Sequence, residues 1–395
     1  MGHTGRTASV ARAVCAVGVV VTFSAVALAR PAGATPPPTS PATVTDEWGS
    51  GAKQPDVVKG VTGEVGVDAG NYGAVVREAD GSVEGWGQSW APRGVSTLPR
   101  LAHVVGMADG NDDYAFLEAP TGISPGVCPS GTSVWTVGLN LGSDLGIGDS
   151  SRDTYTTPQE VTALDGLGVV QVVAASGHML ALTCRGDVYV WGSNGEDVLA
   201  MPPNEHDFAK PVLNPTLTKL TRGTSVGVEL ATGSFSADLL VDGRAYGWGN
   251  NNLGQCGCGS SARAVDTPTA VLQDGVAFTS IDGGGDLVDN GHTLALDSHG
   301  HAYCWGDGQQ GQCGLGTTGI VRSPTRVPGL PTLAQALAGG QYSLFLTTGG
   351  SVWTCGDNAK GQIGNGTTTN QLTPVSVLQK MTMISAGAGH ALAAG

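Results

Sequence analysis

The chain has 395 residues and carries 19 basic against 33 acidic side chains, a formal net charge of −14. This acidic balance argues against nucleic acids and anionic membrane surfaces as partners, because binding to their phosphates requires Lys and Arg. The length suits either two or three ordinary domains or one closed repeat array, so length alone does not decide the architecture.

Residues 1–34 have the pattern of a secretory signal peptide. Two arginines give a positive start, a mostly apolar run follows, and Ala32-Gly33-Ala34 forms a small-residue cleavage site. A membrane anchor is the alternative, but the apolar run falls short of the ~20 residues that a spanning helix needs. We therefore expect cleavage after Ala34 and a secreted, extracellular protein, with the TPPPTSPAT segment (residues 35–43) as a proline-stiffened leader.

From residue 44 to residue 395 one phrase returns seven times, ending in a glycine as in AYGWG, AYCWG and VWTCG. The seven anchor glycines are Gly49, Gly87, Gly138, Gly192, Gly249, Gly306 and Gly356. Trp stands one or three residues before each of them, and alternate residues of a strand share a face. The phrase therefore predicts seven β-strands, each with a buried aromatic side.

A second phrase precedes most anchor strands. The runs GHMLALTCRGDVYVWG, beginning at Gly177, and GHTLALDSHGHAYCWG, beginning at Gly291, alternate, turn at a glycine and alternate again, which is typical of hairpins. A polar loop, often GQxGxG, and a PxxV strand follow the anchor. Each repeat is thus expected to form four short strands, with loop glycines that allow positive φ and close packing.

Four strands per unit and a period of about 50 residues are typical of a β-propeller. The phrases WGDGQQGQCGLGTTGIVRSPTRV, beginning at Trp305, and GHTLAL resemble the regulator of chromosome condensation repeat family, and the chain is identified as a secreted, bacterial-type member. The resemblance implies an all-β, seven-bladed propeller over residues 44–395. A WD-type propeller is the alternative, but its period is shorter, at ~40–45 residues, and it lacks the glycine loop.

The two ends of the repeat region complete one another. The first anchor strand, residues 44–49, has no hairpin half before it, and the last hairpin half, GAGHALAAG from Gly387, has no anchor strand after it. We expect the N-terminal strand to complete the last blade, which would close the ring and remove open sheet edges.

Seven cysteines remain after the expected cleavage, and export permits disulfides. Their odd number leaves at least one thiol without an intramolecular partner. The Cys256-Gly257-Cys258 run lacks the spacing of a zinc site. The sequence leaves the pairing open.

Three histidines share one repeat position with residues of other kinds, so we expect a structural role there rather than a ligand set. The seven residues counted at that position are Tyr72, Asp113, His178, Phe235, His292, Tyr342 and His390. Two acidic segments, residues 109–113 and 282–290, could hold Ca²⁺, but neither has the 12-residue pattern of a dedicated calcium loop. We interpret both as solvated loop tips and predict neither a metal site nor a cofactor.

The chain lacks the H-E-x-x-H and Walker motifs. No helix follows the GQCGLG loop to form a phosphate site. We therefore predict no catalytic residues and no enzymatic activity. The nuclear namesake of the family is a nucleotide-exchange factor for a small GTPase and a chromatin binder; an exported acidic chain would meet neither partner, so no exchange residue is carried over.

The favoured hypothesis is a monomeric extracellular scaffold that binds another, unidentified protein. An inhibitor of a secreted hydrolase such as a β-lactamase, a glycan-binding lectin and a propeller enzyme are the alternatives. Loops that differ between blades carry function in such folds, and three segments interrupt the repeat: residues 119–131, 194–218 and 282–290. The predicted partner-binding residues are Trp90, Met201 and Phe208; alternatively, each packs beneath its own loop.

Overall fold

The computed structural model describes residues 45–49, 52–57, 64–70, 73–86, 96–99, 101–110, 113–120, 128–129, 131–175, 177–201, 207–221, 229–232, 236–285 and 290–395. The predicted signal peptide and leader, residues 1–43, lie outside these ranges and stay predictions. None of the helices in the described ranges is long and apolar enough to cross a bilayer.

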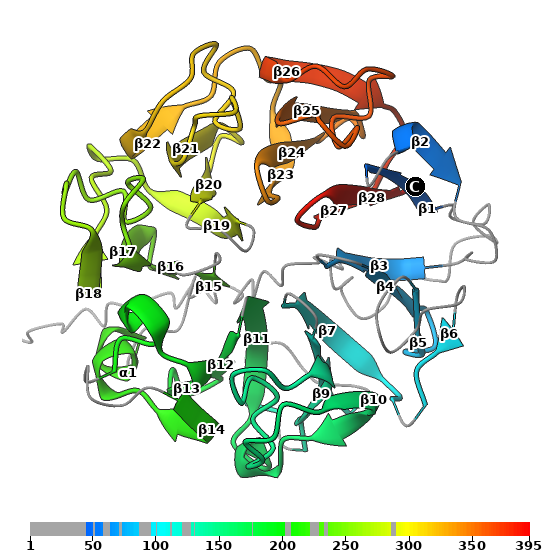
Figure 1. The fold of residues 1–395 in the computed structure, drawn as a ribbon, viewed down its shortest axis with the longest axis vertical. Coiled ribbons are helices and arrows are strands. Elements are labelled where there is room, and N and C mark those ends of the chain that lie inside the picture. The colour runs from blue at the N-terminus through cyan, green and yellow to red at the C-terminus, as the bar shows by residue number, and fades with distance from the viewer. Residues whose placement is uncertain are drawn as a thin grey trace, which may run out of the picture.

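The described residues form seven four-stranded antiparallel sheets arranged around a central axis (Figure 1). In six of them the strands follow chain order from the axis outward. The first three of these sheets are β3 (Glu64–Ala69), β4 (Ala74–Glu78), β5 (Val83–Trp86), β6 (Ser96–Thr97); β7 (Val104–Asp109), β8 (Asp113–Glu118), β9 (Ser133–Leu139), β10 (Thr154–Glu160); and β11 (Val169–Ala175), β12 (His178–Thr183), β13 (Val188–Ser193), β14 (Asp207–Leu213). The next three are β15 (Glu229–Thr232), β16 (Ser236–Val241), β17 (Arg244–Asn250), β18 (Ala264–Ala270); β19 (Phe278–Gly285), β20 (Gly291–Asp297), β21 (Ala302–Gly306), β22 (Val321–Arg326); and β23 (Leu333–Ala338), β24 (Tyr342–Thr347), β25 (Val352–Gly356), β26 (Gln371–Leu378).

The seventh sheet combines strands from the two ends of the chain. It consists of β27 (Met383–Ala386), β28 (His390–Ala394), β1 (Thr45–Gly49) and β2 (Ala52–Val57), in that order from the axis. Strand β1 pairs antiparallel with β28 along its whole length, from Thr45 opposite Ala394 to Gly49 opposite His390. The all-β propeller with four-stranded antiparallel blades, expected from the period, is confirmed.

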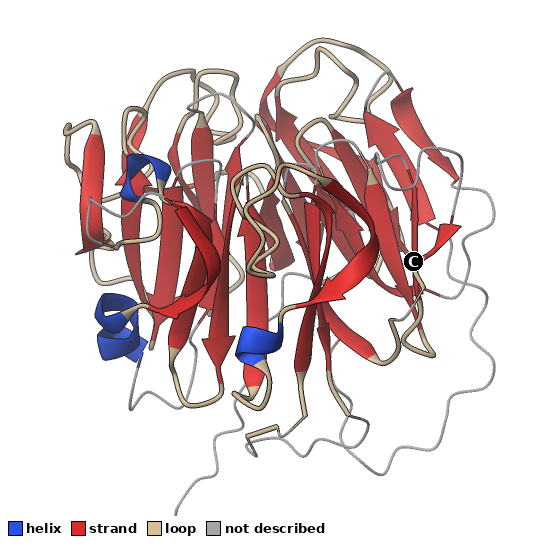
Figure 2. Cartoon of the chain, turned by 60° about the horizontal axis from the view of Figure 1, so that its bottom comes forward, coloured by secondary structure: helices blue, strands red, loops and turns tan. Residues whose placement is uncertain are grey.

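Helical turns are few among the described residues and lie outside the sheets (Figure 2). They are η1 (Thr162–Leu164), η2 (Gly195–Asp197) and α1 (Pro215–Thr221). Helix α1 buries Leu217 in the largest hydrophobic core cluster. Antiparallel strands therefore make up most of the described secondary structure, as the sequence predicted.

The second strand of a blade is buried on both faces. Every residue of β12, β16, β20 and β24 is buried, whereas the outer strands β10 and β18 are mostly exposed. A blade standing alone would leave both faces of such a strand in solvent. Both faces of these strands instead pack against neighbouring blades, so the apolar and small residues of the GHxLAL phrase are all inside.

The tryptophans of the anchor strands join neighbouring blades. Trp191 and Trp248 are fully buried, and each indole N–H donates to a backbone carbonyl of the preceding blade, at 2.8 Å to Asp144 and at 2.7 Å to Val198. A buried indole requires such an acceptor. Where Trp stands three residues before the anchor glycine, as Trp135 and Trp353 do, the side chain is only half-buried.

Candidate functional sites

Carboxyl groups near the axis contact the neighbouring blades. Asp68 of β3 accepts a hydrogen bond from the Ser385 hydroxyl of β27 at 3.2 Å. Asp282 of β19 accepts one from the Ala338 backbone N–H of β23 at 2.8 Å. These contacts commit one oxygen of each carboxylate to holding adjacent blades together.

Burial changes the protonation of these acids. Desolvation raises the pKa of Asp68 to about 6 and that of Asp282 to about 7. Desolvation also raises the pKa of Asp109 well above its ordinary value, and the Asp68 carboxylate, with which Asp109 shares a hydrogen bond, adds to the effect. The acids near the axis therefore retain protons closer to neutral pH than exposed aspartates do.

A fourth acid, Asp238 of β16, is buried and accepts a hydrogen bond from Thr293 of the next blade at 2.8 Å. Desolvation raises the pKa of Asp238 to about 8. The interpretation of residues 109–113 and 282–290 as solvated loop tips is wrong for three acids. Asp109 ends β7, Asp113 begins β8 and is buried, and Asp282 lies within β19. The inner hairpins of the blades draw these residues inside the ring.

The repeat position that carries three histidines lies opposite the anchor glycine, and all its described members are buried. They are Asp113, His178, Ser236, His292, Tyr342 and His390. The assignment of Phe235 to this position is wrong, because Val241 pairs with Arg244 across a two-residue turn and this short hairpin places Ser236 opposite Gly249. Phe235 and Tyr72 lie outside the described residues.

His292 shows the chemistry of this position. Its Nε2 lies 2.8 Å from the Ser343 hydroxyl in the next blade, and burial lowers the pKa of His292 to about 3. The imidazole is therefore neutral at physiological pH. This contact between blades supports the structural role that the sequence suggested for the position.

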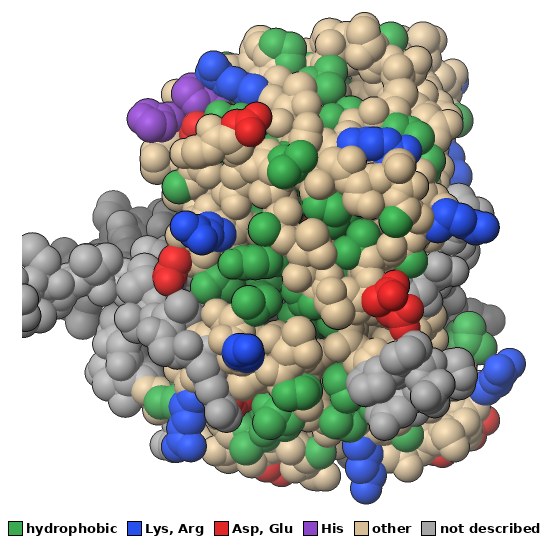
Figure 3. Space-filling model, turned by 90° about the vertical axis from the view of Figure 1, so that its left-hand side faces the viewer, with side chains coloured by type: hydrophobic (Ala, Val, Ile, Leu, Met, Phe, Trp, Pro, Cys, Tyr) green, Lys and Arg blue, Asp and Glu red, His purple; other side chains and the backbone are tan. Residues whose placement is uncertain are grey.

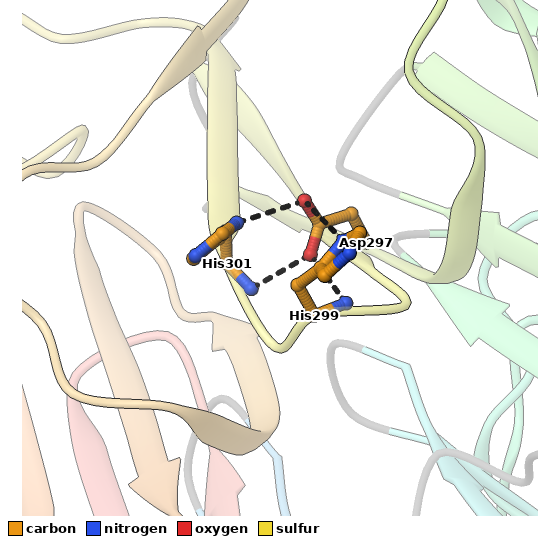
Figure 4. Close-up of side chains that lie close together, drawn as sticks. All are labelled: Asp297, His299 and His301. Atoms are coloured by element: carbon orange, nitrogen blue, oxygen red, sulfur yellow. Dashed lines mark hydrogen bonds and ion pairs between the residues drawn. The ribbon is translucent and has the colours of Figure 1, made fainter.

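The hairpin between β20 and β21 brings a different set of side chains together (Figure 4). Asp297, His299 and His301 each place one ligand atom within 4.8 Å of the others. Asp297 Oδ2 lies 3.0 Å from Nδ1 of His301 and 3.9 Å from Nδ1 of His299. The two imidazole rings stack at 5.8 Å between centroids. The sequence reading missed this group; its signal was the D-x-H-x-H run at a hairpin turn.

Two of the three predicted partner-binding residues are described, and neither is exposed. Phe208 is buried in the largest core cluster and Met201 packs against the same cluster half-buried, which favours the alternative that each lies beneath its own loop. Trp90 lies outside the described residues. The segment 194–218, read as an insertion, in fact supplies η2, the outer strand β14 and the start of α1.

Among the described residues, six cysteines pair and a seventh is free. The disulfides are Cys128–Cys184, Cys256–Cys258 and Cys304–Cys313, and Cys355 is a buried free thiol. Among them, Cys128–Cys184 joins the segment between β8 and β9 to the β12–β13 hairpin of the next blade. This bond therefore links two adjacent blades covalently.

Apolar side chains are exposed on the outer wall of the ring. Figure 3 looks at the left-hand side of Figure 1 and shows hydrophobic side chains gathered near the middle of the wall, flanked by charged ones. The large hydrophobic residues that are exposed in the described ranges are Leu141, Leu213, Leu272, Ile320 and Leu372. Leu272, Ile320 and Leu372, the rim set, come from three consecutive blades and are 50%, 41% and 37% exposed.

The rim set follows the glycine loops of the wall. The Leu272 backbone N–H donates to the Gly257 carbonyl at 3.1 Å, in the loop between β17 and β18. Ile320 of the next blade lies beside Gly254 of the same loop. The Leu372 carbonyl accepts from the Gly316 N–H, in the loop of the preceding blade, at 2.8 Å. The rim set is therefore spread along one wall, with a glycine loop between successive members.

Comparisons with known proteins agree with this architecture. A family model described as the regulator of chromosome condensation (RCC1) repeat matches residues 242–296, 299–346 and 349–394, and a second model of the same description matches residues 169–197. Human E3 ubiquitin-protein ligase HERC2 is 31% identical over 196 residues, 47% of this chain and 4% of that protein. The human probable E3 ubiquitin-protein ligase HERC6 is 28% identical over 223 residues, 55% of this chain and 20% of that protein. The chain thus spans a minor part of both relatives.

Solved structures give the same fold. Prp20p of Saccharomyces cerevisiae has a TM-score of 0.72 at 17% identity, covering 90% of this chain and 91% of that one. Human WBSCR16 has a TM-score of 0.74 at 19% identity, covering 90% of this chain and 99% of that one. The repeat phrases, the four-stranded blades and the matched repeat models agree: residues 169–197, 242–296, 299–346 and 349–394 of this chain are regulator of chromosome condensation repeats.

Proposed function

We propose that this protein is an exported, non-catalytic, monomeric scaffold that binds another protein through the outer wall of a closed, seven-bladed ring. The pairing of β1 with β28 supports closure, since it joins the two ends of the repeat region within one sheet. Export rests on the sequence of residues 1–34. Disulfides are compatible with it, because they persist in oxidising compartments.

The ionisable groups near the axis support a binding role over catalysis. Asp68, Asp238 and Asp282 each bond to an adjacent blade, and His292 is held neutral against Ser343. A catalytic site needs a base or nucleophile that can reach a substrate. These groups instead hold blades together.

The exposure of the rim set is the observation that carries the proposal. Leu272, Ile320 and Leu372 are large apolar side chains that three neighbouring blades leave in solvent. Single exposed leucines are ordinary on protein surfaces, but apolar residues that recur along one wall suit a protein interface with a polar surround. Prp20p, which shares this fold, has binding properties to Gsp1p and histones. By analogy, protein binding is the use that we propose for this ring.

The test compares capture by three forms of the mature protein. Immobilised wild type, a Leu272→Asp/Ile320→Asp/Leu372→Asp variant and a charge-matched control are incubated with culture supernatant, and bound proteins are identified by mass spectrometry. The control places three aspartates on the exposed positions Thr97, Thr156 and Thr162 of other blades. We expect the control to retain a partner that the rim variant loses. If the rim variant retains every partner, the binding surface lies elsewhere. The partner's identity also decides between a general scaffold and an inhibitor of a secreted hydrolase.

A further inference from the structure

The hairpin turn between β20 and β21 needs only one side-chain acceptor. In the next blade, Thr347 Oγ1 accepts from the Ser351 N–H at 2.9 Å across the matching turn. In an earlier blade, Thr183 Oγ1 accepts from the Asp187 N–H at 3.0 Å. A threonine hydroxyl therefore suffices to stabilise this type of turn.

One carboxylate oxygen of Asp297 accepts the hydrogen bonds of its turn, and the turn does not need the second oxygen. Its Oδ1 accepts from the backbone N–H groups of His299 and His301, both at 2.9 Å. Its Oδ2 faces the two imidazoles, and the Tyr303 hydroxyl lies 3.5 Å from it. Neither imidazole is required by the fold, because glycine and serine occupy the corresponding positions, Gly349 and Ser351, of the next blade.

We propose that Asp297, His299 and His301 bind a divalent transition-metal ion of the zinc class. Imidazole nitrogen and carboxylate oxygen are ligands that suit Zn²⁺, Ni²⁺ and Cu²⁺. Three protein ligands leave at least one coordination position for water or for a donor from another molecule. The site lies at the β20–β21 hairpin turn and shares no residue with the acids near the axis or with the rim set.

The distances suit such an ion with small side-chain rotations. At zinc bond lengths, the ligand atoms of a tetrahedral site are roughly 3.3–3.5 Å apart. The observed separations from Asp297 Oδ2, 3.0 Å and 3.9 Å, lie on either side of that spacing. The Asp297 side chain is 9% exposed and is fixed by its backbone bonds, while those of His301 and His299 are 37% and 76% exposed. The carboxylate is thus preorganised, and the imidazoles can adjust around it.

Zinc binding to tag-free mature protein is the test, measured by equilibrium dialysis against micromolar ZnCl₂. We expect about one zinc per chain. The Asp297→Thr/His299→Gly/His301→Ser variant rebuilds the turn of the next blade, and we expect it to lose at least about tenfold in affinity. The single variant Asp297→Thr retains the acceptor for the turn, so its own loss of zinc reports the missing carboxylate rather than a damaged hairpin.

The control is His103→Asn, which removes an exposed histidine outside the group at a positive-φ position that Asn tolerates. It should bind zinc as the wild type does. Circular dichroism verifies that every variant is folded. The proposal is overturned if the wild type binds no zinc, or if the triple variant binds it with unchanged affinity, since the ion would then be held elsewhere.

Discussion

The indole N–H of Trp305 donates a hydrogen bond to the backbone carbonyl of Gln255, which lies 50 residues earlier in the chain, at 3.0 Å. Trp191 and Trp248 make the same contact with the blades before them. In these three repeats the anchor tryptophan thus binds the loop of the previous repeat. The contact links the anchor phrase of one blade to the loop phrase of the blade before it.

The first prediction tests the packing of that loop. Gly257 has φ of +62°, and a Cβ there would lie 2.7 Å from the Trp305 ring. Gly257→Ala should lower the free energy of unfolding by about 2–4 kcal/mol, from backbone strain and overpacking together. The matched control is Gly275→Ala, where φ is +83° but no atom lies within 4 Å of the added Cβ. It should lose only about 1–2 kcal/mol. Equal losses in urea unfolding would mean that the indole contact does not require glycine.

The second prediction concerns ring closure. Removal of residues 44–49 deletes β1, which lies between β28 and β2, and leaves the β28 edge without its partner. We expect destabilisation of the whole ring by several kcal/mol, at about 1 kcal/mol for each lost hydrogen bond, rather than fraying of one end. Thermal unfolding followed by calorimetry measures this, with a deletion of residues 35–43 as the control. A midpoint equal to that of the control would show that the ring does not depend on β1.

The third prediction uses the pKa of Asp238, which burial raises to about 8. The folded protein keeps this proton while the unfolded chain, with an ordinary aspartate, releases it, so stability falls as pH rises until the folded pKa is passed. Between pH 6.5 and 8.5 this one group should lower the free energy of unfolding by about 2 kcal/mol, at about 1.4 kcal/mol per pH unit. The ordinary histidine pKa of 6.5 is the lower edge of this window, so buried His292 contributes mainly below it.

Asp238→Asn isolates that contribution, because an amide oxygen can still accept from Thr293 but the side chain cannot titrate. We expect the variant to lose about 2 kcal/mol less than the wild type over the same interval of urea unfolding experiments. Parallel pH profiles for the two proteins would contradict a raised pKa at Asp238.

The fourth prediction concerns the disulfide between blades. Cys128 and Cys184 are 56 residues apart in sequence, and closing a loop of that size stabilises a fold by about 2–4 kcal/mol. Cys128→Ser/Cys184→Ser should lower the thermal midpoint, and a non-reducing peptide map of exported wild type should contain the linked pair. Two free thiols at these positions in exported protein would show that the bond does not form.

Much of the fold followed from the sequence because one interaction repeats. The anchor glycines and tryptophans, the hairpin turns and the orphan halves at both ends gave the propeller and its four-stranded blades. The register of the β16–β17 hairpin did not follow, since counting back from Gly249 assumes equal turns and this turn has two residues. The sequence also did not predict how Asn251 holds the glycine loop. Its side-chain oxygen accepts from the Cys256 N–H at 3.1 Å, and its side-chain amide donates to two backbone carbonyls later in the loop. The sequence does contain a sign of this arrangement: in four repeats an Asn stands two residues after the anchor glycine.

The candidate sites were harder to predict than the fold. Phe208 stands in a segment that departs from the repeat, yet the outer strand β14 carries it into the core, because a fourth strand can form from a sequence without the PxxV phrase. Asp297 and His301 serve a turn that threonine and serine serve elsewhere. Only the three-dimensional comparison of matching turns shows that the second carboxylate oxygen and both imidazoles exceed what the turn needs.

The most direct test of the central claim, that the outer wall binds a protein, is hydrogen–deuterium exchange on the mature protein with and without its captured partner. We predict slower exchange in β18 and β22 and in the glycine loops beside Leu272, Ile320 and Leu372, and unchanged exchange in the inner strands β3, β7 and β19. Protection confined to the inner strands, with the rim set unchanged, would contradict binding through the wall.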